Sequence, residues 1–132
     1  MMVSFIQSNY AGFGSGIAIP GTGIAMQNRG SGFSLDPASP NIVGPNKRPF
    51  HTISPGFLRG PDGPLLSFGV IRGLMQAQGH VQMVLRAQVW GEDQQMAVDA
   101  PRWRFIEGLK LACEDVLPAE TLTYLAQIGH LI

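Results

Sequence analysis

The amino-acid sequence predicts an α+β fold in which strands and helices occupy separate parts of the chain. Apolar and polar residues alternate with the period of a strand in the first half, and this period changes after Gly73 to the spacing of a helix. Strands followed by helices, with no regular alternation between them, favour a layered α+β sandwich over a doubly wound parallel sheet. The strand-like segments are residues 2–8, 23–28, 51–59 and 64–70.

Length and composition predict one domain over residues 1–132 with an unusually apolar surface. Charged residues make up 14% of the chain and apolar residues 45%, whereas an ordinary soluble domain has roughly 25% charged residues. A surface of this kind indicates a missing partner. The nine basic and nine acidic residues cancel and form no dense basic stripe, so we expect no nucleic-acid partner.

Five glycines crowd into the stretch GFGSGIAIPGTGIAM, residues 12–26. A dinucleotide-binding fingerprint needs G-x-G-x-x-G at a strand-to-helix turn, but here Gly12, Gly14 and Gly16 have a different spacing and lead into a strand. No phosphate-binding P-loop motif occurs either. The glycines therefore predict tight turns in a hairpin-like connection, followed by an ordered but irregular loop over residues 29–50.

The second half of the chain contains turn and helix signals that can be placed one by one. Pro and Asp-Gly at residues 60–63 predict the turn of a β-hairpin. A helix is expected from Leu74 to Trp90 because apolar residues recur at helical spacing and Gly91 follows. The remaining expected elements are a short helix within 93–101, an extended segment over 103–114, and a helix opening with Pro118 at its first position.

The sequence predicts neither a metal site nor a bound cofactor. Cys113 is the only cysteine, which excludes an internal disulfide, and its alternation with Leu109 and Leu111 indicates the buried face of a strand. The three histidines lie on three different predicted elements with no ligand-like spacing.

Membrane and export signals are not evident in the sequence. Gly, Gln or Arg interrupts every apolar run well short of the roughly 18 residues that a bilayer-spanning helix requires. The first ten residues lack the basic and apolar regions of a signal peptide. The cellular compartment stays open.

The passage LLSFGVIRGLMQAQ runs from a predicted strand through Gly69 and Gly73 into a helix. Free backbone N–H groups at such a helix start can hold an anion or a developing oxyanion. A tight turn with a purely structural role has the same composition, so both interpretations remain open.

Five phrases of the sequence together resemble a known family. NYAGFGSGI, GTGIAMQNRGSGFSLDP, PNKRPFHTISP, SFGVIRGLMQAQGHVQ and DAPRWRF occur in the order and spacing of the small-subunit region of the gamma-glutamyltranspeptidases. The similarity covers essentially the whole chain, is weaker after Glu107, and is closest to the transpeptidase-like or acylase-like bacterial branch. It implies part of an αββα sandwich of the N-terminal nucleophile hydrolase type.

The resemblance also implies a reaction. In this family a precursor cuts itself, and the newly exposed N-terminal Thr attacks a gamma-glutamyl amide with its own amine as the base. An acyl-enzyme then passes the glutamyl group to water or to an amino acid. That Thr is expected upstream of Met2, so the chain is expected to be a fragment truncated at both ends and inactive alone.

The partners implied are the large subunit or missing N-terminal part of a precursor, together with further copies of this chain in a homo-oligomer. A different class of function remains open beside the enzyme. The chain could instead be a non-catalytic interaction subunit or a decayed paralogue that completes a partner's sheet.

By resemblance, His51 and Thr52 stand at the family's paired serines, which contact the substrate carboxylate. Arg72 and Gly73 stand at its double-glycine oxyanion segment, where we expect the Arg72 side chain to intrude on the first glycine position. No catalytic side chain is therefore expected in this chain, only oxyanion-hole backbone at Gly73 and Arg72.

Two further positions differ from the transpeptidases. Arg29 and Gly32 stand where those enzymes carry a Gln and an Asp, and loss of the Asp removes the expected partner of a substrate ammonium. Asn9 corresponds to the family's Asn in the strand after the nucleophile, with the spacing off by one residue. The substrate-binding residues predicted from the resemblance are His51, Thr52, Arg29 and Asn9.

Overall fold

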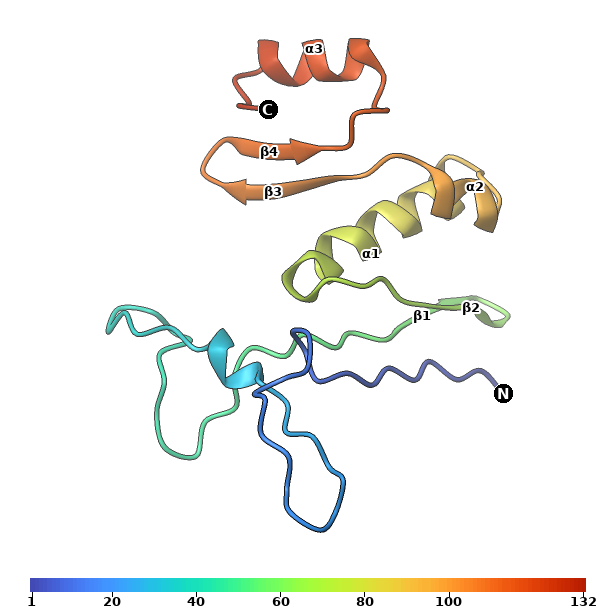
Figure 1. Ribbon diagram of the computed structural model, residues 1–132. Coiled ribbons are helices and arrows are strands. Elements are labelled where there is room, and N and C mark those ends of the chain that lie inside the picture. Colours follow the sequence, from blue (N-terminus) through green and yellow to red (C-terminus); the bar gives the residue numbers. More distant parts are fainter. The chain divides into compact units, whose positions relative to one another are not determined.

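The computed structural model describes all 132 residues and has an α+β fold, as the sequence predicted (Figure 1). The chain divides into two compact units, Met1–Gln76 and Ala77–Ile132. The first unit carries one β-hairpin and long irregular segments, and the second carries most of the helical residues and a second hairpin. A single domain over residues 1–132 stays a prediction.

The hairpin of the first unit consists of β1 (Gly56–Gly60) and β2 (Gly63–Phe68), paired antiparallel. Its turn lies at the predicted Pro-Asp-Gly sequence, and the register shifts between Leu58 and Arg59. The strand expected over 51–59 begins only at Gly56, because β2 ends opposite that residue and the preceding Pro55 has no N–H to donate.

Residues 2–8 are extended but do not form the predicted strand. They lie beside β2 through serine hydroxyls: Ser67 Oγ donates to the Val3 carbonyl at 2.9 Å, and Ser4 Oγ donates to the Phe68 carbonyl at 3.4 Å. The same segment runs beside the hairpin in the ribbon view (Figure 1). Side-chain hydroxyls thus replace the backbone ladder that alternation alone predicted.

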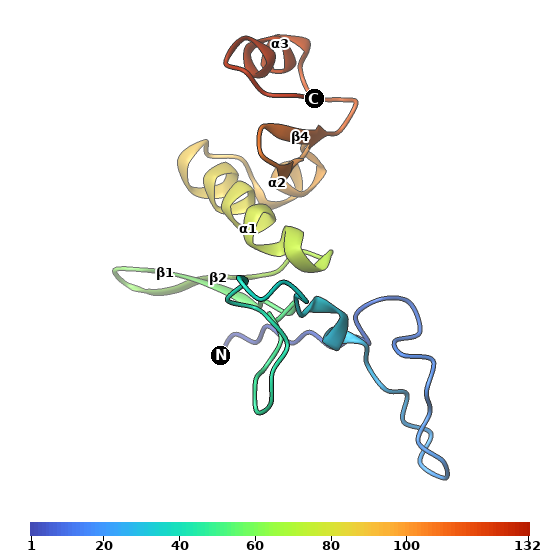
Figure 2. The ribbon, with the colours of Figure 1, turned by 90° about the vertical axis from the view of Figure 1, so that its left-hand side faces the viewer.

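The glycine-rich stretch forms a narrow hairpin-like loop, as expected. Its arms are joined by Met26 N–H to Ile17 O at 2.8 Å and by Ile19 N–H to Ile24 O at 2.9 Å. Figure 2 shows this loop reaching away from the rest of the first unit. The strand predicted over 23–28 is wrong as a strand, because the arms share one isolated bridge and the turns leave too little length for a ladder.

The irregular segment over 29–50 opens with a 3₁₀ turn, η1 (Arg29–Gly32), which the sequence did not reveal. The rest is an ordered loop without strands, as predicted. The Asn41 side-chain amide donates to the Gly32 carbonyl at 2.6 Å, and Ser34 exchanges backbone hydrogen bonds with Asn41 and Val43. These bonds fix the segment that carries Arg29.

The helix predicted from Leu74 to Trp90 is confirmed. It consists of η2 (Gly73–Met75), α1 (Gln76–Val84) and η3 (Leu85–Val89), with no loop between them. The last turn widens to the π form, in which Trp90 N–H bonds Leu85 O at 3.0 Å, and Gly91 ends it with φ +70°.

The second unit continues with α2 (Gln94–Asp99), β3 (Trp103–Glu107), β4 (Lys110–Cys113) and α3 (Ala119–Gln127). Each element matches a predicted segment, and β3 and β4 pair antiparallel. Pro118 is the residue before α3 and not its first residue, because its ψ of 133° is extended. Leu109 lies exposed in the turn, so the buried face of β4 comprises Leu111 and the half-buried Cys113.

Two glutamines of α1 bind the exposed edge of β3. Gln82 Nε2 donates to Trp103 O at 2.8 Å, and Phe105 N–H donates to Gln78 Oε1 at 2.6 Å. The glutamines are four residues apart and their backbone partners two apart, so one helix face meets one strand edge.

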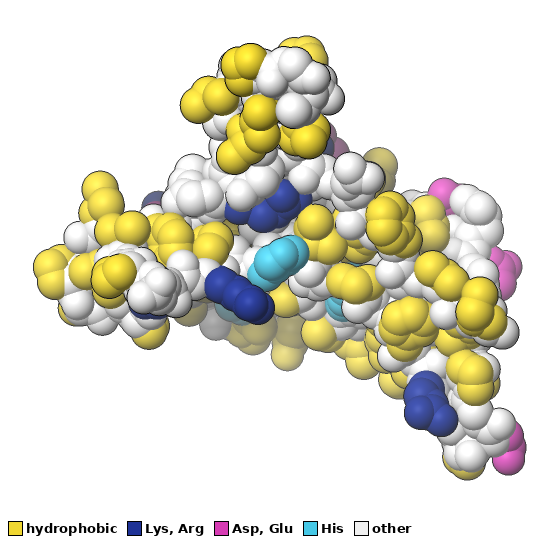
Figure 3. All heavy atoms as spheres, turned by 90° about the horizontal axis from the view of Figure 1, so that it is seen from below, with side chains coloured by type: hydrophobic (Ala, Val, Ile, Leu, Met, Phe, Trp, Pro, Cys, Tyr) yellow, Lys and Arg dark blue, Asp and Glu magenta, His cyan; other side chains and the backbone are white.

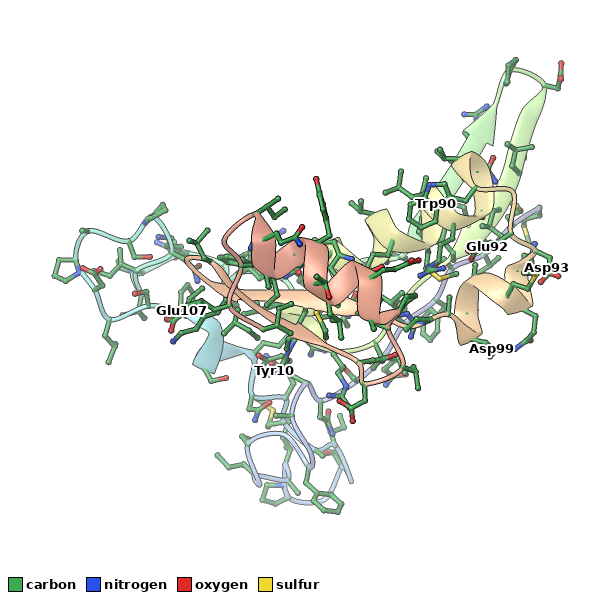
Figure 4. All side chains as sticks on the ribbon, turned by 90° about the horizontal axis from the view of Figure 1, so that it is seen from above. Tyr10, Trp90, Glu92, Asp93, Asp99 and Glu107 are labelled. Atoms are coloured by element: carbon green, nitrogen blue, oxygen red, sulfur yellow. The ribbon has the colours of Figure 1, made fainter.

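The Arg86 side chain stabilises the bend that follows η3. Arg86 forms an ion pair with Glu92 at 2.8 Å, lies over the Trp90 ring at 5.4 Å, and donates to the Pro101 carbonyl. Figure 4 shows Trp90 and Glu92 close together where η3 gives way to α2. Arg86 thereby joins the end of the long helix to both ends of α2.

Much of the surface is apolar. Thirty large hydrophobic side chains are exposed, whereas Ala97 and Leu111 are the buried apolar residues. Figure 3 shows hydrophobic side chains spread over the face that it presents, with few charges among them. No helix has the length and apolar character needed to cross a membrane.

Candidate functional site

Thr52 is the centre of a buried polar cluster in the first unit. It is 5% exposed, and its Oγ1 accepts a hydrogen bond from Arg29 Nε at 3.1 Å. Its carbonyl accepts from the Gln76 side-chain amide, whose oxygen in turn accepts from Ser54 N–H at 2.9 Å. Gln76 therefore fixes the backbone on both sides of Ile53 and orients Thr52.

Arg29 is buried beside Thr52, with 8% of its surface exposed. Its Nη1 donates to the Ser8 carbonyl at 2.9 Å, and its Nη2 donates to Ser8 Oγ at 2.6 Å. All three protein partners of the guanidinium are neutral oxygens, and no carboxylate pairs with it. A buried charge of this kind ordinarily has a counter-charge.

The turn into the long helix has a left-handed backbone at two successive residues, Arg72 with φ 91° and Gly73 with φ +48°. Their N–H groups donate to no acceptor within the chain. Adjacent free N–H groups in such a turn form a concavity that binds anions. The turn can therefore serve as an oxyanion hole.

Gly73 is packed against the rest of the cluster. A Cβ at this position would lie 3.2 Å from Tyr10 Cε2 and 3.8 Å from Thr52 Cγ2. Tyr10 itself has a positive φ of 79° and lies at the base of the glycine-rich loop (Figure 4). The close approach of Tyr10 and the left-handed backbone together favour glycine here.

The structure brings together three of the sequence-predicted residues, Arg29, Thr52 and Gly73, with the backbone of Arg72. The His51 side chain is exposed, and its Nδ1 accepts a bond from Ile53 N–H at 3.1 Å, so the ring is bound to its own loop. His51 as a substrate-binding residue stays a prediction.

Asn9 precedes the strained Tyr10 and is half-buried, and its carbonyl accepts from Asn28 N–H at 3.2 Å. This bond ties the N-terminal segment to the residue before Arg29. Asn9 therefore supports the cluster through its backbone, and substrate contact by its side chain stays a prediction. The Gly32 carbonyl is bound by Asn41, so Gly32 shapes the loop after Arg29.

Sequence reasoning missed Ser8, Tyr10 and Gln76, which complete the cluster. Tyr10 lies in NYAGFGSGI, residues 9–17, where the resemblance suggested only Asn9, and Ser8 immediately precedes that phrase. Gln76 lies three residues after Gly73 in the helix, where a buried polar residue at 5% exposure is a signal that only the structure provides.

The unit that contains the cluster has more basic than acidic residues. Residues 1–76 contain five lysines and arginines but only two acidic residues, Asp36 and Asp62. Asp36 is exposed and accepts a bond from Ala38 N–H in its own loop at 2.9 Å, and Asp62 is exposed in the hairpin turn. The cluster is thus suited to hold an anion.

Comparisons with known proteins bear directly on this cluster. A model of the gamma-glutamyltranspeptidase family matches residues 1–132. The chain is 43% identical over 103 residues to an oxamate amidohydrolase proenzyme of Klebsiella pneumoniae. The aligned region covers 78% of this chain and 20% of that protein. It is 37% identical over 137 residues to a glutathione hydrolase-like proenzyme, YwrD, of Bacillus subtilis, covering 98% of this chain and 26% of that one.

Solved structures of similar proteins superpose on most of the chain. A cephalosporin acylase from Bacillus halodurans superposes with a TM-score of 0.87 and 50% identity, covering 95% of this chain and 23% of that chain. A T380A mutant of the Helicobacter pylori gamma-glutamyltranspeptidase gives a TM-score of 0.87 at 25% identity, covering 98% of this chain and 76% of that chain.

The relatives are proenzymes, and the chain spans about a fifth to a quarter of their length. The family match extends from the first residue to the last and includes every residue of the Thr52 cluster. The chain belongs to the gamma-glutamyltranspeptidase family.

Proposed function

We propose that the chain forms the acyl-binding side of an amide-hydrolysing or acyl-transferring active site within a larger precursor. The observation that carries this proposal is the position of Thr52, whose Oγ1 is bound by the Arg29 guanidinium and whose Cγ2 would lie 3.8 Å from a Cβ at Gly73. Thr52 thus lies next to both a guanidinium, which can bind an anion, and a turn that can hold an oxyanion. The names of the relatives, an amidohydrolase, a glutathione hydrolase-like protein and an acylase, support this class of reaction.

In this proposal the nucleophile is an N-terminal Thr released by cleavage of the precursor. Its hydroxyl oxygen bonds to the amide carbon, its proton passes to the Thr amine, and the substrate nitrogen leaves with a proton. Water or an amine then takes the acyl group. The Gly73 and Arg72 N–H groups stabilise the oxyanion in both steps.

The proposed partner is the rest of the precursor, and assembly with further copies of this chain is part of the same proposal. The exposed hydrophobic side chains and the low charge support a covered surface. The side chains that become buried when the chain assembles with the rest of the precursor would define the interface.

Gly73→Ala in the complete processed protein tests the proposal. The added methyl group would meet Tyr10 Cε2 at 3.2 Å, and its strain at φ +48° should tilt the N–H groups, so kcat for amide hydrolysis should fall about 100-fold or more. Gly12→Ala is the matched control, because Gly12 has a similar φ of +51° but no atom within 4 Å of the added carbon. Equal effects of the two substitutions on kcat would remove Gly73 from the catalytic turn.

The alternative of a non-catalytic interaction subunit or decayed paralogue is favoured by Arg72, which by the resemblance stands at the first glycine of the transpeptidases' oxyanion segment. Under that alternative the complete protein folds and binds its partner but releases no amine or ammonia from any amide. Turnover that Gly73→Ala abolishes decides for the enzyme.

A further inference from the structure

We propose that Gln76 is a positioning residue for the reaction. Its side-chain amide holds the Thr52 segment, residues 51–55, at the start of the long helix, so that Thr52 and the Gly73 turn keep a fixed separation while the substrate reacts. This inference rests on the proposed function. It adds a residue that acts on the reaction through the Thr52 segment and the turn.

The first argument is that the Thr52 segment has little else to hold its backbone. Residues 51–55 form no backbone–backbone hydrogen bond with another part of the chain, and the ring of His51 bonds only within the segment. The Gln76 amide bonds the backbone on both sides, at the Thr52 carbonyl and at Ser54 N–H. Gln76 therefore supplies the hydrogen bonds that tie this backbone to the rest of the first unit.

The second argument is the place of Gln76 in the helix. Gln76 is the first residue of α1 and follows directly on η2, which begins at Gly73. Met75 N–H donates to the Arg72 carbonyl at 2.9 Å, so hydrogen-bonded helical backbone joins the turn to Gln76. Such backbone is stiff, and the Gln76 amide thus has a set position relative to the N–H groups of the turn.

The third argument is that the bonding requires an amide. The Thr52 carbonyl can only accept and Ser54 N–H can only donate, which matches the donor and the acceptor of one glutamine side chain. Gln76 is 5% exposed, so water does not readily replace it. Gln76→Met would leave both backbone groups unpaired and release the segment. A shift of about 1 Å in a positioned group can lower a reaction rate about 100-fold.

Gln82 provides a matched control on the same helix. It is 6% exposed, and its amide also bonds two backbone groups, the carbonyl and the N–H of Trp103. Those groups belong to β3 and not to the Thr52 cluster. Gln76→Met and Gln82→Met thus remove the same groups from equally buried positions, and their thermal unfolding midpoints should fall by similar amounts. A difference in catalysis then reports positioning and not stability.

The test is the kcat and KM of the complete processed protein. The probe is whichever of oxamate, glutathione and a gamma-glutamyl anilide the wild-type protein hydrolyses fastest. Gln76→Met should lower kcat about 10-fold or more and change KM less than about threefold, because an oxyanion forms only in the transition state. Gln82→Met should leave kcat and KM within about twofold of wild type.

A double-mutant cycle with Gly73→Ala examines whether Gln76 acts through the turn. If it does, the combined variant should lose less kcat than the product of the two separate losses, because the second change disturbs a turn that the first has already displaced. A loss equal to the product would show that the two residues act independently and would overturn the inference.

Equal kcat for Gln76→Met and Gln82→Met, or a Gln76→Met loss expressed in KM alone, also overturns the inference. If Gln76→Met does not fold, Gln76→Glu and Gln82→Glu take the place of the pair, since glutamate keeps the length and the acceptor and loses the donor. The proposed function fails separately, when the wild-type protein hydrolyses no amide or when Gly73→Ala leaves kcat unchanged.

Discussion

At the scale of single residues, the site depends on left-handed backbone at non-glycine positions. Tyr10, Asn46 and Arg72 are the non-glycine residues with positive φ, and two of them lie at the turn packed around Gly73. A left-handed conformation costs an L-residue roughly 1–2 kcal/mol. Such strain concentrates at functional sites, where the surrounding structure enforces it.

Arg72→Gly should therefore stabilise the protein. Glycine adopts φ 91° without a clash, and its greater freedom in the unfolded state offsets part of the gain, leaving up to about 1 kcal/mol. The midpoint of thermal unfolding should rise. Arg48→Gly, at an exposed position with negative φ, should instead lower it or leave it unchanged. A lower midpoint for Arg72→Gly would show that the arginine side chain contributes more than its strain costs.

At the scale of elements, local patterns predicted the β1–β2 hairpin and the long helix. Pro and Asp-Gly determine the turn, and the change of period at Gly73 marks the start of the helix. These signals lie within a few residues of the structure that they produce.

Long-range contacts explain what sequence patterns could not predict. Residues 2–8 alternate like a strand, but Ser4 and Ser67 take up the carbonyls through their hydroxyls across 64 positions of the chain. Arg29 and Thr52 came from the family resemblance, whereas their contacts with Ser8 and Gln76 depend on how distant segments pack. No periodicity encodes a bond between residues 21 or more positions apart.

Gln82 illustrates an element-scale contact that can be tested. Its side chain is buried and accepts from Trp103 N–H while donating to Trp103 O, so it replaces a neighbouring strand at the edge of β3. Gln82→Met preserves the helix but leaves both backbone groups unpaired, which should cost about 1–3 kcal/mol of unfolding free energy. Hydrogen exchange at the Trp103 amide should accelerate as well.

Gln88→Met is the matched control for this substitution, since Gln88 is exposed on η3. Its unfolding free energy should stay within about 0.5 kcal/mol of wild type. A similarly small change for Gln82→Met would mean that water or another group readily replaces the glutamine.

At the scale of the whole molecule, the exposed apolar side chains predict association. Low charge and exposed β-edges give little protection against it, so the chain expressed by itself should form dimers or larger species in light scattering. Co-expression with the rest of the precursor should give a defined complex with less binding of a hydrophobic dye. A monomer at high concentration that binds no dye would contradict the expected covered surface.

The most direct test of the Thr52 cluster as an acyl-binding site is a crystal structure of the complete processed protein with the carboxylic acid product of an amide that it hydrolyses. A carboxylate oxygen of the product should lie within about 2.7–3.1 Å of the Gly73 N–H, next to Thr52. A product acid bound away from the Gly73 turn would contradict the account.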